Sequence, residues 1–289
     1  MMRLSEPQYT YQDTLNKCIS GITGNNHLKQ KLKDSKDALE QSEVQYVQAA
    51  NSGALYGILP IDTSEKIDPN VVANLTKSEL KNIYDIYFRP EEKPGREIYD
   101  HILNSANEKC PYCGGIGTPR NLDHYLPIAH FPQFSVVPRN LVPACRDCNM
   151  DGEADGYATR PEDQIIHPYL DSERYFSDQW IFATYQVGNA GQPGVIEYQA
   201  NPPANWPGVD RLRVQNHFRD FGLSRRYATK AAQLIGTTLS QVRQMRLNGV
   251  NEHGIAHMLL IPGVTSAPFV NHWQRGMYQA LIVALPQIV

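Results

Sequence analysis

Residues 110–149 read CPYCGGIGTPRNLDHYLPIAHFPQFSVVPRNLVPACRDCN, and this stretch decides the centre of the fold. A Cys-x-x-Cys pair opens it and another closes it, with 31 residues between the second and third cysteines. Two intervening residues let both thiolates of a pair face one ion, and two such pairs complete a tetrahedron. Gly114-Gly115 permits the tight turn that the first pair needs. The sequence therefore predicts a structural Zn²⁺ held by Cys110, Cys113, Cys145 and Cys148.

Two disulfides or a thioredoxin-type redox pair are the alternatives to zinc. Disulfides fit poorly, because the start MMRLSEPQYTYQD lacks the apolar core of a secretion signal. A redox motif accounts for one pair of cysteines but not for two. Cys18, the fifth cysteine, is expected to be buried and inert.

The composition is that of an ordinary soluble protein. The chain has 289 residues, of which 41% are hydrophobic and 20% charged. Its net charge of −3 excludes a protein that coats nucleic acid by bulk charge. No apolar run approaches the roughly 18 residues of a membrane span. We expect a cytoplasmic protein with no membrane partner.

A histidine-centred motif lies between the two cysteine pairs. Residues 121–127 read Asn-Leu-Asp-His-Tyr-Leu-Pro, and residues 140–149 read Asn-Leu-Val-Pro-Ala-Cys-Arg-Asp-Cys-Asn. With Cys-Pro-Tyr-Cys-Gly-Gly and Phe131-Pro132, they resemble the HNH endonuclease family. The similarity is greatest to the D-H-Y-L-P subgroup, found beside ATPases in bacterial antiphage systems such as Septu and retron-linked operons. It covers about residues 80–235.

The resemblance implies a ββα-metal fold and a metal-dependent hydrolase of nucleic-acid phosphodiester bonds. It implies that His124 is the general base, and that Asp123 and Asn149 bind one Mg²⁺ or Mn²⁺. It implies that Asn140 braces the loop around the base. The implied products are a 5′-phosphate and a 3′-hydroxyl. The implied setting is antiviral defence, with DNA or RNA as substrate and a companion ATPase as partner.

The chemistry of the residues supports these roles independently. Phosphodiester hydrolysis needs a base for water and positive charge near the phosphate oxygens. A histidine with an ordinary pKa near 6.5 suits the base at neutral pH. Adjacent strand residues point to opposite faces, so Asp123 and His124 reach one centre only in a bent hairpin or at a strand end.

The chain departs from the family where phosphate is usually held. Many members carry lysines after the final Asn, whereas residues 150–155 here read Met-Asp-Gly-Glu-Ala-Asp. The position after Pro127, often Lys in the subgroup, is Ile128. We therefore expect phosphate contacts from elsewhere. The window 211–246 has eight basic residues and one acid, a net charge of +7. The candidate phosphate-binding residues are Arg139, Arg146, Arg225 and Arg226.

The periodicity of the rest of the chain predicts an α+β protein. Helices are expected in 12–50, in 77–88 after a Thr76–Glu79 capping box, and in 95–107. A hairpin is expected in 180–200 with its turn at 188–191, followed by two helices in 209–246 broken at Gly222. A last helix pair in 253–285 should split at Pro262-Gly263. The expected regions are an N-terminal helical region 1–76, a nuclease core 77–170, and a hairpin with C-terminal helices 171–289.

Two functions from other classes stay open beside the nuclease. A noncatalytic zinc-knuckle module that binds nucleic acid or protein shares the four cysteines but has no need of Asp123 or His124. A thiol redox protein predicts reactive thiols and loss of function on alkylation.

Overall fold

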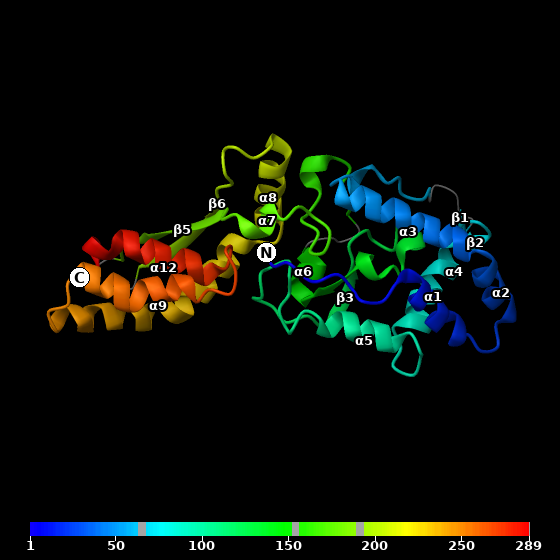
Figure 1. Cartoon of the computed structure of the whole chain (residues 1–289), viewed down its shortest axis with the longest axis horizontal. Coiled ribbons are helices and arrows are strands. Elements are labelled where there is room, and N and C mark those ends of the chain that lie inside the picture. Colours follow the sequence, from blue (N-terminus) through cyan, green and yellow to red (C-terminus); the bar gives the residue numbers. More distant parts are fainter. Residues whose placement is uncertain (63–67, 152–155, 189–193, 289) are drawn as a thin grey trace. The chain divides into compact units, whose positions relative to one another are not determined.

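The computed structural model describes residues 1–62, 68–151, 156–188 and 194–288. The protein is mixed α+β, and the strands of the described residues form two-stranded antiparallel sheets (Figure 1). Contacts group the chain into two compact units. The first unit is Arg3–Pro111 with Gly117–Ser172; the second is Glu173–Val289 with Met1–Met2 and Tyr112–Ile116. The division at residues 76 and 170 stays a prediction.

The first unit opens with helices and then alternates short strands with short helices. Its opening elements are α1 (Tyr11–Ser20), α2 (Asn26–Asp34), α3 (Lys36–Asn51), the 3₁₀ turn η1 (Leu55–Gly57), β1 (Asn70–Val72) and β2 (Leu75–Thr76). Its later elements are α4 (Lys77–Asn82), the π turn η2 (Ile83–Phe88), α5 (Arg96–Asn104), β3 (Asn121–His124), the 3₁₀ turns η3 (Pro132–Phe134) and η4 (Pro138–Asn140), β4 (Leu141–Ala144), α6 (Arg146–Asp151) and the 3₁₀ turn η5 (Pro161–Asp163).

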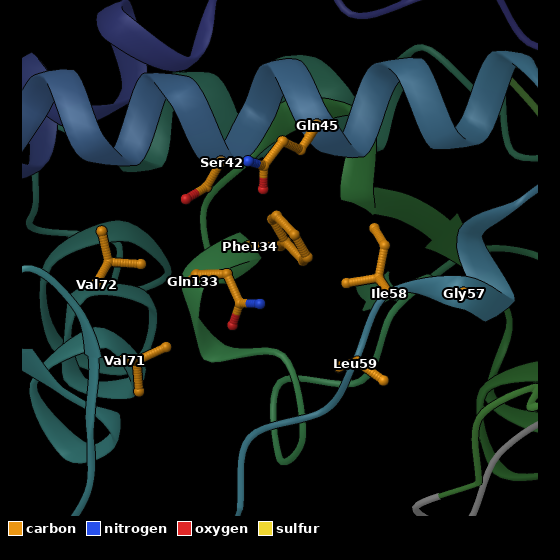
Figure 2. A pocket seen from close by; sticks show the side chains of 9 residues that line it. All are labelled: Ser42, Gln45, Gly57, Ile58, Leu59, Val71, Val72, Gln133 and Phe134. Carbon is orange, nitrogen blue, oxygen red and sulfur yellow. The ribbon is translucent and has the colours of Figure 1, made fainter.

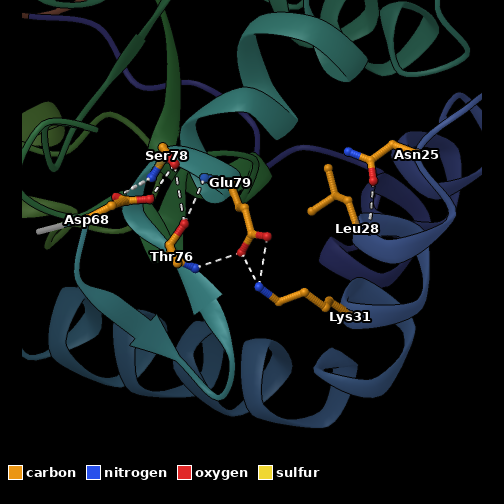
Figure 3. Close-up of polar contacts among 7 residues, drawn as sticks. All are labelled: Asn25, Leu28, Lys31, Asp68, Thr76, Ser78 and Glu79. Carbon is orange, nitrogen blue, oxygen red and sulfur yellow. Dashed lines mark hydrogen bonds and ion pairs between the residues drawn. The ribbon is translucent and has the colours of Figure 1, made fainter.

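The capping box expected at the start of α4 is confirmed. The Thr76 hydroxyl accepts a hydrogen bond from the Glu79 N–H, and the Glu79 carboxylate accepts one from the Thr76 N–H (Figure 3). The same carboxylate pairs with the Lys31 ammonium of α2 at 2.6 Å. Asp68 accepts hydrogen bonds from the N–H and hydroxyl of Ser78 in the first turn of α4. These contacts satisfy donors at the helix start and link α2 to α4.

In the second unit a β-hairpin packs on two helices, 223–247 and 273–284. Its elements are α7 (Arg174–Ser177), β5 (Ile181–Gln186), β6 (Val195–Ala200), α8 (Gly208–Asp220), α9 (Leu223–Leu247), α10 (Glu252–Ile255), the π turn η6 (Ala256–Leu260), α11 (Ile261–Thr265), α12 (Trp273–Ala284) and the 3₁₀ turn η7 (Leu285–Gln287). The expected hairpin is confirmed, although positions 189–191 of its turn lie outside the described residues. The break at Gly222 is also confirmed, because that residue has a φ of +56° that favours glycine.

The split expected at Pro262-Gly263 is wrong. The π turn η6 leads directly into α11, in which Pro262 occupies the first turn. The Ile261 N–H donates to the Ala256 carbonyl, and this wider turn accommodates a proline ring that would clash in a regular helix. The helix ends at Thr265, shortly before Pro268, which restricts the residue in front of it. No helix in the described ranges is both long and apolar enough to cross a bilayer.

Candidate functional site

Strands β3 and β4 form an antiparallel pair that leads straight into α6. Asp123 lies opposite Val142, and His124 lies opposite Leu141. The chain passes from the end of β4 at Ala144 through Cys145 into the helix. The order strand, strand, helix is therefore present, with His124 as the last residue of β3.

The four paired cysteines gather into one buried cluster. Their sulfur atoms all lie within 4.8 Å of one another. None of the five cysteines, all within the described residues, forms a disulfide. Four thiolates around one tetrahedral Zn²⁺, each at roughly 2.3 Å, would lie about 3.8 Å apart. The donor set and its spacing thus fit a zinc ion bound by Cys110, Cys113, Cys145 and Cys148.

The remaining cysteine is unsuited to chemistry. Cys18 lies in α1 with no exposed surface. Burial raises the pKa of its thiol to about 12, so the nucleophilic thiolate is scarce at neutral pH. The expectation of a buried cysteine at this position is confirmed.

His124 is buried and held by one backbone group. Its Nε2 lies 2.8 Å from the Ser135 carbonyl oxygen, which can only accept, so Nε2 carries the proton and donates it. The Tyr84 ring packs edge-on against the imidazole, with ring centroids 4.5 Å apart. Burial lowers the pKa of His124 to about 4. The imidazole is therefore neutral at pH 7, and Nδ1 is its basic atom.

Asp123 leaves β3 on the face opposite to His124 and is half-buried. Burial raises the pKa of its carboxyl group to about 7. A backbone hydrogen bond from His124 acts against burial and lowers the pKa of this carboxyl group, but burial has the larger effect. A desolvated carboxylate gains from a bound cation, so the oxygen atoms of Asp123 suit a hard metal ion.

Asn149 lies inside α6, where its N–H donates to the Cys145 carbonyl at 3.0 Å. It therefore does not cap this helix. Its side chain is half-buried and has no hydrogen-bond partner among the described residues. The amide oxygen is thus available as a ligand.

Asn140 is fully buried, and the protein uses all of its amide groups. Oδ1 accepts from the Leu126 N–H at 2.8 Å. Nδ2 donates to the carbonyls of Leu126 and Phe134, both at 3.2 Å. These bonds tie the segment after His124 to the turn before Ser135, which are the contacts of a residue that braces a loop.

The four candidate arginines have different surroundings. Arg139 pairs with the carboxylates of Glu6 at 2.7 Å and Glu43 at 3.2 Å. Arg146, the first residue of α6, is exposed. On α9, Arg225 is exposed, whereas Arg226 is half-buried and donates to the Phe221 carbonyl. Arg146 and Arg225 are thus the most accessible to a phosphate.

Sequence reasoning missed the two groups that hold His124 in place. Tyr84 lies in the helix expected over 77–88, and its ring contacts the imidazole. Ser135 acts through its carbonyl, so no side-chain pattern could have indicated it. The Ser135 hydroxyl in turn donates to the Leu80 carbonyl of α4 at 2.9 Å.

Comparisons with known proteins give one full-length relative and one partial relative. Protein ea31 of Escherichia phage lambda is 36% identical over 293 residues, covering 97% of each chain. The Septu protein PtuB of Bacillus thuringiensis is 30% identical over 107 residues, or 36% of this chain and 38% of PtuB. No protein-family profile and no solved structure matches. Because the similarity to protein ea31 spans nearly the whole of both chains, this protein belongs to the ea31 family.

Proposed function

We propose that this protein is an HNH-type nuclease in which His124 is the general base. The observation that carries the proposal is the tethered imidazole, whose Nε2–H donates to the Ser135 carbonyl at 2.8 Å. This leaves the lone pair of Nδ1 to accept a proton from water. A positioned base of this kind typically contributes 10²–10⁴-fold to a rate.

Asp123 and Asn149 are the residues that would hold a divalent cation. Their oxygen donors suit Mg²⁺ or Mn²⁺. Such a cation supplies positive charge to the phosphate oxygens as negative charge develops on them. Asn140 keeps the loop between His124 and Ser135 in place. The cysteine cluster fixes the end of β4 and the start of α6, and hence the position of Asn149.

The partial similarity to the Septu protein PtuB supports a role in antiphage defence, because the D-H-Y-L-P motif resembles the same group of systems. We infer a companion ATPase as partner on that basis. Arg146 and Arg225 are the proposed phosphate contacts, and we assign Arg139 to its two carboxylates instead. Co-expression with a candidate ATPase, followed by size-exclusion chromatography, tests the partner.

The test of the nuclease is a cleavage assay on plasmid, single-stranded DNA and total RNA, with Mg²⁺, Mn²⁺ or EDTA. The test variant is His124→Gln, whose side-chain amide still donates a hydrogen bond but lacks a basic nitrogen. We expect metal-dependent cleavage to fall by at least 100-fold while the zinc content stays unchanged.

His217→Gln is the matched control. His217 is also buried, and its Nε2 donates to the Tyr112 carbonyl at 3.0 Å. Burial lowers its pKa to about 3, as it does for His124. Cleavage should persist in this variant. Retained zinc with binding but no metal-dependent cleavage by the wild type would favour the noncatalytic zinc-knuckle module, and loss of function on alkylation alone would favour a thiol redox protein.

A further inference from the structure

A hollow of about 460 Å³ lies in the first unit, between α3, β1, the segment after η1, and the turn η3 (Figure 2). Its walls are largely aliphatic, and none of the described residues that line it is ionisable or a histidine. Such walls select an occupant by shape and leave its chemical class open. A pair of histidines in the second unit, by contrast, carries the donor atoms of a metal site.

His253 and His257 are four positions apart on one continuous helical stretch. His253 belongs to α10 and His257 to the π turn η6, and Ile255 and Ala256 between them keep right-handed helical backbone angles. Residues four apart on a helix lie on the same face, one above the other. Both histidine side chains are exposed, and their ring centroids are 5.2 Å apart. The two imidazoles therefore form one accessible group, called here the histidine pair.

The spacing of the two rings matches a shared metal ion. An imidazole nitrogen binds Zn²⁺ at about 2.0–2.1 Å, and this nitrogen lies about 1.2 Å from the centre of its own ring. Two rings bound at a tetrahedral angle therefore have centroids about 5.3 Å apart. The observed separation is 5.2 Å, so an ion fits between the two side chains without movement of the backbone.

Neither imidazole is committed to another polar group. The ring nitrogens of His253 and His257 take part in no hydrogen bond or ion pair within the described residues. Glu252, which precedes the pair, is held instead by Arg246 at 3.2 Å. The pair therefore supplies two ligands, and water completes the coordination of an ion bound there.

The type of donor atom selects the class of ion. Imidazole suits Zn²⁺, Ni²⁺ and Cu²⁺, whereas Mg²⁺ and Mn²⁺ prefer oxygen donors. Two histidines four positions apart on one helix face hold zinc in the H-E-x-x-H metalloproteases. We propose that the histidine pair binds one divalent ion of the Zn²⁺, Ni²⁺ and Cu²⁺ group, as a metal site separate from the cysteine cluster and from Asp123. The inference does not depend on the proposed nuclease function.

The test is titration calorimetry with NiCl₂ on the full chain, with zinc already bound at the cysteine cluster. Excess Mg²⁺ in the buffer competes for the oxygen donors of Asp123 and Asn149. His253→Asn and His257→Asn each remove one imidazole and leave a polar side chain on the helix surface. Because the second histidine binds the ion intramolecularly once the first has bound it, either variant should weaken Ni²⁺ binding at least about tenfold.

His27→Asn is the matched control. His27 is also exposed and lies on a helix, α2, but no other histidine is within four positions of it. Its loss should leave the Ni²⁺ affinity unchanged. Hydrogen exchange gives a second readout, because one ion holds two successive helical turns together. Ni²⁺ should therefore slow the exchange of the amides of α10 and η6 in the wild type but not in His257→Asn.

Equal Ni²⁺ affinity in the wild type and in both histidine-pair variants would overturn the proposal, as would an equal loss of affinity in His27→Asn. Unchanged exchange of the α10 and η6 amides in the wild type with bound Ni²⁺ would also overturn it, because the ion would then be bound elsewhere. None of these measurements involves cleavage, so their outcome is independent of the His124→Gln result.

Discussion

Replacing Asn140 by alanine is expected to release the segment that follows His124. The side chain makes three buried hydrogen bonds, one from the Leu126 N–H and two to the carbonyls of Leu126 and Phe134. Each such bond contributes about 1 kcal/mol, and a buried group left unpaired costs about 1–3 kcal/mol. The local stability should therefore fall by at least about 3 kcal/mol, a large share of the roughly 5–15 kcal/mol that stabilises a domain.

Amide hydrogen exchange resolves this effect residue by residue. The Leu126 amide loses its acceptor in Asn140→Ala, and about 3 kcal/mol corresponds to roughly 100-fold faster exchange. The neighbouring Tyr125 amide donates to the backbone carbonyl of residue 140 at 2.8 Å, which the substitution leaves in place. Its exchange should rise less. Tryptophan emission cannot replace this measurement, because Trp180, Trp206 and Trp273 all lie in the second unit.

Asn140→Asp separates the two halves of the brace. The carboxylate still accepts from the Leu126 N–H but cannot donate to the carbonyls of Leu126 and Phe134. The Leu126 amide should then exchange at least as fast as in Asn140→Ala, because a buried carboxylate that faces two carbonyl oxygens is strongly unfavourable, and cleavage should fall in both variants because the loop around His124 is loosened. Wild-type protection of Leu126 in Asn140→Ala would refute the assignment of Asn140 as the residue that braces this loop.

Two further outcomes are expected. Cys145→Ser should remove the bound zinc, as measured by mass spectrometry of the metal, and should reduce the helical circular dichroism signal. The control variant Cys18→Ala should keep its zinc. Equal zinc content in the two variants would contradict a zinc site at the cysteine cluster. Although burial alone would raise the pKa of Glu79, hydrogen bonds from Lys31 and from the Thr76 N–H lower it below the usual value. The ionised Glu79 carboxylate therefore stabilises the folded protein fully at pH values above the ordinary glutamate pKa, near 4.3. This contribution is lost as the pH falls through the lowered pKa of Glu79 in the folded protein. Glu79→Gln keeps a residue suited to the capping box but loses the ion pair with Lys31. Its free energy of unfolding, measured by circular dichroism, should be up to about 1 kcal/mol below that of the wild type at pH 7 and equal to it at pH 3. A difference in unfolding free energy that is the same at both pH values would contradict this.

Short sequence patterns predicted much of the secondary structure, because the interactions that start or end a helix involve residues only a few positions apart. The Thr76–Glu79 capping box needs only a hydroxyl and a carboxylate three positions apart, and both hydrogen bonds form. The break before α9 needs a glycine at a left-handed position, and Gly222 supplies it. Pro262 misled the prediction, since the π turn before it removes the clash that normally stops a helix.

The catalytic proposal depends on contacts between distant positions that no local pattern contains. His124 was marked by its motif, but its tautomer is set by the Ser135 carbonyl, eleven positions away. The Gln133 Oε1 atom, which is buried without a hydrogen-bond partner, gave no sequence signal, because glutamine side chains are mostly exposed in proteins.

The sequence by itself indicated the mixed α+β class and the two Cys-x-x-Cys pairs of a metal cluster, and it marked His124 as the candidate base, because spacing and residue type suffice for each. The tertiary structure alone decided that the four thiols meet within 4.8 Å, that His124 is neutral, and that Arg139 is bound to two carboxylates. The physical reason is that proximity and desolvation are properties of the folded chain. Residues far apart in sequence create them together when the chain excludes water from the space between them.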